Sequence, residues 1–420
     1  MERILWPCRT ALAVAIAAGA SGTALAGVTV QCPGDQNGDA ISDGRGDPDH
    51  PNARCVHLGA GDGYVRMADG RPLYMFGFSD LTGISEKKAM DTGMLAATFP
   101  APTIVADEGD ELYLTLTNVG MAVRPDLFDP HTVHYHGFPE ASSIFDGVPE
   151  ASVSINMGSS LTYYYNLVEP GTYMYHCHVE ATEHMQMGML GNLYIRPIQN
   201  RLPDGTALGT HVHSNPDYNA DRNDDDPTVG DTYAYNDGDG STRYDVDYAI
   251  QLGSFDPAFH DASETTQPLP FAYMEDRYAM LNGRGYPDTV SSTPPQAPAE
   301  NGGIESQPLD SLIEAQQGER ILLRLSNLNV TNFYTVSSQG IPMQVIGRGA
   351  RILRGGGTPD GRDLYYRTSS VTLGGGEAAD VLLDTTGIQP GTYFLYTTNF
   401  QYLTNNGADV GGMMTEIVIN

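Results

Sequence analysis

The chain has 420 residues and a formal net charge of −30 at pH 7, and Lys87 and Lys88 are its only lysines. A surface this acidic repels the phosphate backbone, which excludes nucleic acids as partners. It favours cationic partners or metal ions, although a solvated surface suited to a salty medium explains the charge as well. Abundant glycine, tyrosine and proline with alternating apolar runs predict an all-β protein, and the length suits two domains.

Residues 1–26 have the pattern of a secretory signal peptide. Arg3 and Arg9 lie near the start, an Ala/Val/Ile-rich run follows, and Ala24-Leu25-Ala26 forms a small-x-small cleavage site. No later segment is apolar for long enough to span a membrane. We therefore expect cleavage near Ala26 and a periplasmic or secreted protein without a membrane anchor.

Residues 27–60 form a polar N-terminal extension. Cys32 and Cys55 bracket a short loop and could form a disulfide, which an exported protein can keep. Within the loop, Asp35, Asn37 and Asp39 place oxygen ligands at alternate positions, a pattern that suits Ca²⁺. The closing Glu of an EF-hand loop is absent. A calcium site and a polar, disulfide-closed loop are therefore equally open hypotheses.

The rest of the chain divides into two strand-rich blocks, residues 61–198 and 245–420, separated by an acidic linker or surface excursion at 199–244. The second block repeats the first. Residues 109–118 match residues 318–327, residues 170–174 match residues 390–394, and Gly188-Met189 has a counterpart in Gly412-Met413. The repeat predicts two copies of one Greek-key β-sandwich domain.

Six of the eleven histidines lie in two short windows, residues 131–137 and 175–189. Side chains of a strand alternate between its two faces, so Cys177 points away from the histidines on either side of it. The same alternation separates the histidines of the first window. The two windows therefore sort into two sets that converge on opposite sides: His131, Cys177, His184 and Met189 form one set, and His134, His136, His176 and His178 form the other.

The first set predicts a blue copper site, because a thiolate, two imidazoles and a weak axial thioether are the ligands of such centres. Met189 is the preferred axial ligand, and Met185 and Met187 are weaker candidates that packing explains better. The second set offers four imidazoles without a thiolate, which suits copper that binds oxygen. Cys177 is bonded on both sides to histidines of that set, so a short covalent path joins the two sites.

These motifs resemble those of two-domain multicopper oxidases, laccase-like members of the cupredoxin superfamily. The His-x-x-His-x-His-Gly and His-Cys-His…His…Met patterns carry the resemblance, together with residues 99–104, 146–149 and 281–284. It implies two cupredoxin-like domains, and a type 1 copper that passes electrons through Cys-His to a cluster that reduces dioxygen. It also implies the ligands: His131, Cys177, His184 and Met189 for type 1 copper, and His134, His136, His176 and His178 for type 2/type 3 copper.

Asp146 resembles the carboxylate near such a cluster that helps to protonate reduced oxygen. A turn aspartate before Gly147 is an equally open explanation.

The second block departs from the family pattern. A cluster in this family takes eight histidines, half from each of two domains, whereas this chain brings four. Where the first block has His134-Tyr135-His136-Gly137, the second has Ser337-Ser338-Gln339-Gly340, and Tyr396-Thr397-Thr398 replaces His176-Cys177-His178. We therefore expect copper ligands only in the N-terminal domain.

Three hypotheses follow. The favoured one is an oxidase whose cluster is completed between chains, in a homo-oligomer such as a dimer or trimer, or by another copper protein. The second is a blue-copper electron-transfer or copper-binding protein without oxidase activity. The third and weakest is a nitrite-reductase-like trimer that uses His260, the only histidine of the second block. The electron donor stays open among a small molecule, a metal ion and a basic redox protein.

Overall fold

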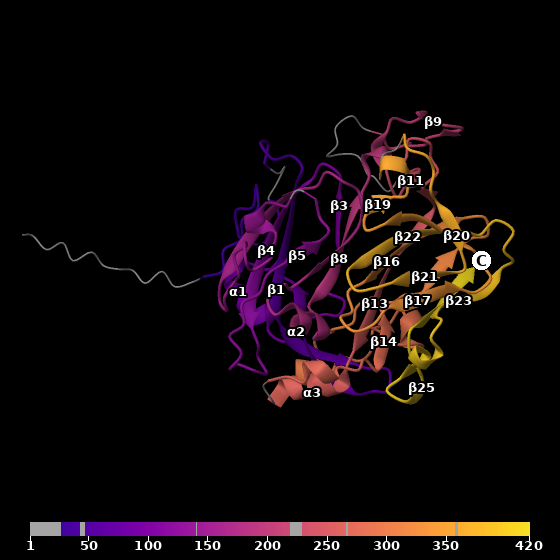
Figure 1. The fold of residues 1–420 in the computed structure, drawn as a ribbon. Helices are drawn as coiled ribbons and strands as arrows, with labels where there is room; N and C mark the ends of the chain where they lie inside the picture. The colour runs from indigo at the N-terminus through magenta and orange to yellow at the C-terminus, as the bar shows by residue number, and fades with distance from the viewer. Residues whose placement is uncertain (1–26, 43–46, 140, 219–228, 266–267, 358–359) are drawn as a thin grey trace, which may run out of the picture.

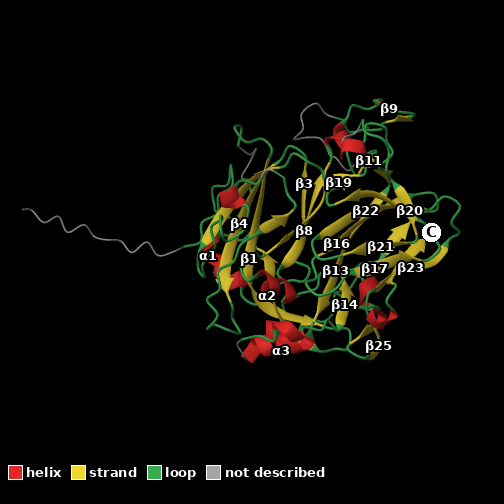
Figure 2. Ribbon diagram, in the orientation of Figure 1, coloured by secondary structure: helices red, strands yellow, loops and turns green. Residues whose placement is uncertain are grey.

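The computed structural model describes residues 27–42, 47–139, 141–218, 229–265, 268–357 and 360–420 (Figure 1). The predicted signal peptide (residues 1–26) and the most acidic part of the linker (residues 221–226) lie outside the described residues. Strands are the main regular secondary structure of the described chain, with short helices and many loops around them (Figure 2). The predicted all-β fold is confirmed.

The N-terminal domain is a sandwich of two four-stranded sheets. Its elements are β1 (Ala53–Arg66), β2 (Pro72–Asp80), α1 (Glu86–Gly93), β3 (Ile104–Asp107), β4 (Glu111–Gly120), β5 (His134–His136), β6 (Ser160–Asn166), β7 (Gly171–His176), α2 (Ala181–Gln186) and β8 (Leu190–Arg196). One sheet has the order β2-β1-β4-β6 and the other β3-β8-β7-β5. In β4, Leu112, Leu114 and Leu116 alternate with Tyr113, Thr115 and Thr117, and the three leucines are fully buried in the core of the sandwich.

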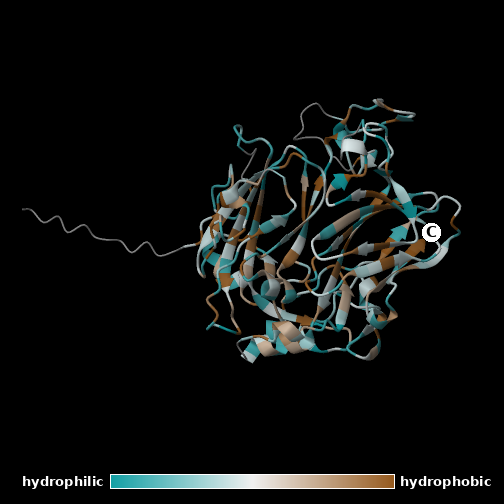
Figure 3. Cartoon of the chain, in the orientation of Figure 1, coloured by the Kyte–Doolittle hydropathy of each residue, from teal (hydrophilic) through white to brown (hydrophobic). Residues whose placement is uncertain are grey.

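The second domain repeats this plan with larger sheets. Its elements are β13 (Val246–Phe255), α3 (Pro257–Thr265), β14 (Tyr278–Leu281), β15 (Ile313–Ala315), β16 (Arg320–Asn327), β17 (Tyr334–Ser338), β18 (Met343–Arg348), β19 (Arg351–Ile352), β20 (Tyr366–Thr368), β21 (Ser370–Leu373), β22 (Glu377–Asp384), β23 (Gly391–Thr397), β24 (Thr404–Asn405), β25 (Ala408–Gly411) and β26 (Met414–Ile419). One sheet has the order β15-β26-β23-β17-β21, and the other is nine-stranded around β13, β16 and β22. Figure 3 shows hydrophobic residues mostly on the strands of both domains and hydrophilic ones mostly on the loops.

The strand ladders confirm that the two domains are copies of one unit. β1 runs parallel to β4 and antiparallel to β2, and β13 has the same relation to β16 and β14. In the other sheet, His134 of β5 lies opposite His176 of β7, whereas Ser337 of β17 lies opposite Tyr396 of β23. The second domain therefore keeps the backbone register and replaces the histidines.

The segment after this ladder is also shared by the two domains. The N–H of Cys177 donates to the carbonyl of Met189 over 3.2 Å, and the N–H of Thr397 donates to the carbonyl of Met413 over 3.0 Å. Thr397 and Met413 are both buried. The second domain thus retains the methionine but has a threonine in place of the thiolate.

The two domains share a hydrophobic core of their own. Met75, Phe99 and Met174 of the first domain pack against Phe255 and Met280 of the second. Figure 1 shows the indigo-to-magenta domain beside the orange-to-yellow one, with α3 of the second half lying below the first domain. Loops from both domains therefore meet at the ends of β7.

The excursion at residues 199–244 contains two small hairpins in its described part. They are formed by β9 (Ala207–Leu208) with β10 (His211–Val212) and by β11 (Thr232–Tyr233) with β12 (Arg243–Tyr244). Tyr235 and Tyr244 pack against Leu322 and Leu382 of the second domain. The described end of the excursion is thus part of the folded second domain.

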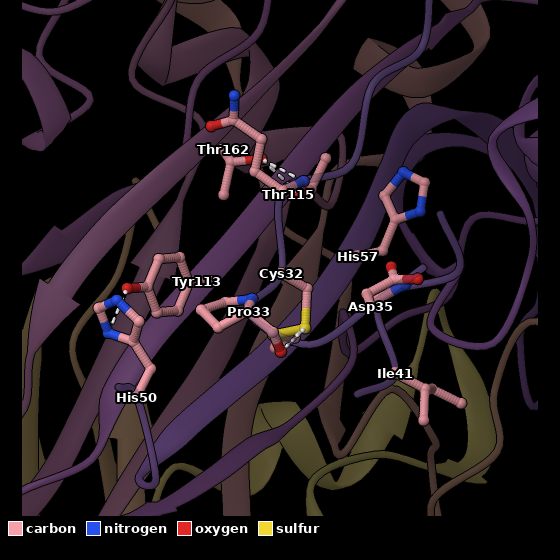
Figure 4. The surroundings of a disulfide bond; sticks show 12 residues. Cys32, Pro33, Asp35, Ile41, His50, His57, Tyr113, Thr115 and Thr162 are labelled. Carbon is pink, nitrogen blue, oxygen red and sulfur yellow. Dashed lines mark hydrogen bonds between the residues drawn. A yellow bond between two sulfur atoms is a disulfide. The ribbon is translucent and has the colours of Figure 1, made fainter. Parts of the chain in front are cut away.

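The N-terminal extension is fastened to the first domain by the predicted disulfide. Cys32 and Cys55 are bonded, and Figure 4 shows the bond against β1. β1 spans Ala53–Arg66 and therefore crosses the domain boundary predicted between residues 60 and 61. Cys55 lies within this strand, so the disulfide ties the extension directly to the first domain. The N–H of Val30 also donates to the Glu86 carboxylate of α1 over 2.7 Å. No helix of the described residues combines the length and apolarity needed to cross a bilayer.

Replacing both Cys32 and Cys55 by serine should lower the free energy of unfolding by about 3 kcal/mol, because the bond closes a loop of 23 residues. Urea unfolding under non-reducing conditions measures the change. The intact protein in reductant should lose a similar amount. An unchanged unfolding midpoint would show that the hydrogen bonds of the extension hold it without the disulfide.

Candidate metal centre

The end of β7 presents chemically different side chains on its two sides. β7 ends at His176, and its pairing with β5 places His134 directly opposite. Cys177 follows and faces the sandwich core, while the rings of His176 and His178 stack on the other side with their centroids 5.5 Å apart. The predicted alternation is therefore present, although Cys177 and His178 lie just beyond the strand.

The thiolate site consists of His131, Cys177, His184 and Met189. Nδ1 of His184 lies 3.2 Å from Sγ of Cys177, and Nδ1 of His131 lies 3.7 Å from it. A metal bonded at about 2.0 Å to nitrogen and about 2.3 Å to sulfur in a trigonal plane holds such atoms nearly 4 Å apart. The ligand atoms of these three residues all lie within 4.8 Å of one another, so a copper ion fits between them.

Burial controls the protonation of this site. His131, Cys177 and His184 are all buried, and Cys177 is the free cysteine of the described chain. Burial raises the pKa of the Cys177 thiol to about 11 and lowers the pKa of His184 to about 4. The metal-free site therefore holds a thiol and neutral imidazoles. Metal binding must release the thiol proton, which makes affinity increase with pH.

Met189 lies on the face of Cys177. Met189 directly precedes Leu190, which pairs with His176 in the ladder between β7 and β8. The carbonyl oxygen of Met189 accepts a hydrogen bond from the N–H of Cys177. Residues directly opposite in an antiparallel pair share a face, and Met189 and Cys177 lie in the same buried cluster. The role of Met189 as axial ligand stays a prediction. Met187 is buried in the same core, whereas Met185 lines the pocket beside the histidines.

His184 is carried by a short helix, α2. The chain turns sharply at Glu180, whose φ of 44° is left-handed, and α2 then spans Ala181–Gln186. The turn brings His184 back over Cys177. Within the described residues, its Nε2 is buried without a hydrogen-bond partner, which leaves the ring free to be oriented by a metal at Nδ1.

The four-histidine site consists of His134, His136, His176 and His178. The ring of His134 is central, with centroids 5.1 Å from His178, 5.3 Å from His176 and 6.2 Å from His136. Burial lowers the pKa of His176 to about 3 and also lowers the pKa of His136. The rings of His176 and His136 are therefore neutral at pH 7, as metal ligands must be.

Two of these rings are oriented by backbone carbonyls. Nδ1 of His134 lies 2.6 Å from the carbonyl oxygen of Asp146, and Nδ1 of His176 lies 2.8 Å from that of Cys177. When Nδ1–H donates to these oxygens, Nε2 carries the lone pair. This outer-shell arrangement is typical of metal-ligating histidines.

Asp146 lies beside the four-histidine site. Its carboxylate Oδ1 is 3.6 Å from Nδ1 of His134, and the side chain is 32% exposed. Gly147 has a φ of 78°, and a Cβ there would lie 2.1 Å from the carbonyl oxygen of Val133. The turn therefore requires glycine, and it holds a solvent-accessible carboxylate next to the ring of His134.

A pocket of about 480 Å³ opens beside His136, His176 and His178. His136 is exposed and His178 half-buried, so the site can be reached from outside. The second domain supplies the opposite wall of this pocket. No local sequence signal indicated this wall, because its residues lie far along the chain from the histidines. The wall includes Leu328, Asn329, Val330, Thr331, Asn332, Phe333, Gly375 and Gly376. Described residues of this wall include no histidine.

His260 is not available as a metal ligand. It is fully buried on α3, with Nδ1 2.5 Å from the carbonyl oxygen of Tyr74 and Nε2 2.9 Å from that of Gln186. The weakest hypothesis, in which His260 serves a nitrite-reductase-like site, is therefore wrong in its use of this residue. Both ring nitrogens are already directed at protein oxygens.

The loop around Asp35 uses its carboxylate internally. Oδ1 of Asp35 accepts from the N–H groups of Asn37 and Gly38, and Oδ2 accepts from the N–H of Ala40. Asp39 accepts from the N–H of Ile41. A calcium ion at Asp35, Asn37 and Asp39 would share these oxygens with the backbone, and calcium binding stays a prediction.

Comparisons with known proteins agree with the fold. Family models described as multicopper oxidase match residues 83–200 and 261–418, well over half of the chain. A multicopper oxidase of Talaromyces pinophilus is 36% identical over 104 residues, which are 24% of this chain and 16% of that relative. Multicopper oxidase MmcO of Mycobacterium tuberculosis is 38% identical over 82 residues, 20% of this chain and 15% of that relative. The similarity thus covers only a small part of the curated relatives.

Solved structures share the fold over nearly the whole chain. The blue copper oxidase from Nitrosomonas europaea superposes with a TM-score of 0.57 at 22% identity, covering 87% of this chain and 86% of that one. The copper nitrite reductase from Nitrosomonas europaea has a TM-score of 0.52 at 16% identity, covering 88% and 94%. At these identities the likeness supports the two-domain cupredoxin fold alone.

Cys177→Ser should abolish the blue absorption of the copper-loaded protein, because the absorption requires a copper–thiolate bond. Visible absorption after copper loading measures the effect. Thr397→Ser, the equivalent change in the second domain, should leave the blue band intact. A blue band that survives in Cys177→Ser would show that the thiolate site has been assigned wrongly.

Acid should destabilise the metal-free protein through its buried histidines. Burial lowers the pKa of both His57 and His260 to about 4. Between pH 6.5 and 4 the unfolded chain binds protons that the folded protein excludes, so stability falls as pH decreases through this window. His57→Asn should remove roughly 2 to 3 kcal/mol of the stability difference between pH 7 and pH 4.5. Urea unfolding of both proteins at both pH values provides the test.

Proposed function

Because the chain belongs to the multicopper oxidase family, we propose that it is an exported copper-dependent oxidoreductase that uses dioxygen as electron acceptor. Its thiolate site accepts electrons from a donor, and its four-histidine site forms half of an oxygen-reducing copper cluster. A second chain completes that cluster. The acidic surface suits a small-molecule, metal-ion or basic redox-protein donor.

The observation that carries this proposal is the position of Cys177 between the two sites. Its sulfur faces His131 and His184, while the residues bonded to it on either side, His176 and His178, face the four-histidine site. A protein that only carried electrons would need the thiolate site alone. The rings of the four histidines lie close together beside Cys177, and this grouping supports the use of both sites.

Copper held at these residues would supply one-electron transfer at the thiolate site and oxygen reduction at the four-histidine site. The protein contributes the surroundings. Burial keeps water away from Cys177, and the carbonyl contacts at Nδ1 of His134 and His176 fix the orientation of both rings. Asp146, exposed to solvent beside His134, is placed to deliver protons.

The need for a second chain follows from the second domain. Ser337 and Tyr396 occupy the ladder positions of His134 and His176, so this domain cannot supply the facing ligands. The exposure of His136 and the open pocket leave room for a partner. Two copies related by a twofold axis would bring eight histidines together, as in a homo-oligomer with isologous contacts.

A blue-copper electron carrier is the second candidate function. Ser337 and Tyr396, which stand in the second domain where the first has His134 and His176, favour this function. The pocket wall opposite the histidines also favours it, because Asn329, Thr331 and Asn332 offer amides and a hydroxyl, which are weak copper ligands. In that case the four-histidine site would bind copper incompletely.

Copper content separates the two functions. In the native oligomer loaded with copper, the oxidase should contain about two and a half copper atoms per chain, one at the thiolate site and half of a shared three-copper cluster. Inductively coupled plasma mass spectrometry with size-exclusion chromatography measures this ratio. About one copper atom per chain with a blue band would overturn the oxidase in favour of the carrier.

The matched variant is His134→Ala, which removes the central ring of the four-histidine site. In an oxidase it should abolish oxygen consumption while the blue band remains. In a carrier it should change neither oxygen consumption nor the blue band.

A further inference from the structure

The loop that carries two ligands of the thiolate site, residues 184–189, is held by the second domain. Gln186 lies between the ligands His184 and Met189. Its carbonyl oxygen is 2.9 Å from Nε2 of His260, and its side-chain Nε2 donates to Oδ1 of Asp276 over 3.2 Å. One residue of the ligand loop thus contacts the second domain at both its backbone and its side chain. The backbone contact is a hydrogen bond in the tautomer of His260 that carries its proton on Nε2, because a neutral imidazole has a single N–H to donate.

These contacts are shielded from water. Gln186 is 2% exposed, Asp276 4% and His260 0%. Hydrogen bonds between buried polar groups contribute more than exposed ones, and removing one partner leaves the other without solvent to replace it. The contacts therefore constrain the loop strongly.

The loop needs such constraint because it has little stability of its own. α2 is only six residues long, which is too short for an isolated helix to persist. On its other side the loop is fixed by β2, where the N–H of Phe76 donates to the carbonyl of Met187 over 2.9 Å. Gly188, with a φ of 116°, packs so closely that a Cβ would lie 2.8 Å from the carbonyl oxygen of Phe76. The loop is clamped between β2 and the second domain.

Asp276 also connects this loop to the four-histidine pocket. Its Oδ2 accepts hydrogen bonds from the hydroxyls of Ser254 and Thr331. Thr331 lines the pocket beside His136 and His178. The same carboxylate thus binds the ligand loop and the wall of the second site.

We propose that Gln186, His260 and Asp276 are positioning residues that set the geometry of the thiolate site, and that this is what the copper-free second domain does for the reaction. The proposal rests on the proposed function, since it assumes that the thiolate site holds type 1 copper. It assigns a role to His260, which is not a ligand, and to a domain that has lost its own site.

Two measurements test the proposal. The first is the rate at which a thiol reagent labels Cys177 in the metal-free protein with its disulfide intact, which reports opening of the loop. The second is the blue absorption maximum and the copper hyperfine splitting in electron paramagnetic resonance of the loaded protein. Both are compared between wild type, Gln186→Leu and His260→Phe. Circular dichroism confirms that each variant is folded.

Gln186→Leu and His260→Phe should label at least about tenfold faster than wild type and show altered spectra, because each removes a buried hydrogen bond to the loop. His260→Gln, which keeps an N–H near the position of Nε2, should stay close to wild type in both measurements. Glu275→Gln is the matched control, since Glu275 adjoins Asp276 but has a side chain that is 66% exposed.

Wild-type labelling rates and spectra in folded Gln186→Leu and His260→Phe would overturn the proposal. If Gln186→Leu does not fold, the His260→Phe and His260→Gln pair decides: equal labelling of the two also overturns it. A wild-type protein without a blue band refutes the proposed function instead, while the labelling rates still show whether the second domain holds the loop.

Discussion

The copper chemistry of this chain depends on the alternation of side chains at the end of β7. Because Cys177 faces the sandwich core and its neighbours face the opposite way, a single segment contributes to both the thiolate site and the four-histidine site. The pairing of His134 with His176 then fixes the second set of rings. A shift of one residue in this register would exchange the faces and separate both sites. The backbone hydrogen bonds between β5, β7 and β8 therefore do as much for function as the ligands themselves.

The sequence predicted the features that depend on local pattern. Strand alternation correctly separated His131, Cys177 and His184 from the four cluster-type histidines, and the internal repeat correctly aligned Ser337 with His134. It also identified Cys32 and Cys55 as a possible disulfide, and the two residues are bonded. All of these follow from periodicity or spacing, which are local properties of the chain.

Features that depend on distant contacts could not be predicted in this way. The sequence shows His260 only as an isolated histidine, and nothing near it indicates that its ring lies against the carbonyls of Tyr74 and Gln186. Likewise, no signal indicated that residues 328–333 form a wall of the histidine pocket. The sequence also gives no signal for the six-residue helix α2, because its stability comes from packing rather than from its own propensity.

The match between Thr397–Met413 and Cys177–Met189 bears on how such a protein can change over time. Both pairs have the same backbone hydrogen bond, and both are buried in well-packed cores. The sandwich is therefore held by its own hydrophobic interior, and the metal is an addition to it. A duplicated domain built in this way can exchange its ligands one substitution at a time without ever passing through an unfolded ancestor. A domain of this kind can support a neighbouring site without ligands of its own, as the contacts of His260 and Asp276 with Gln186 illustrate.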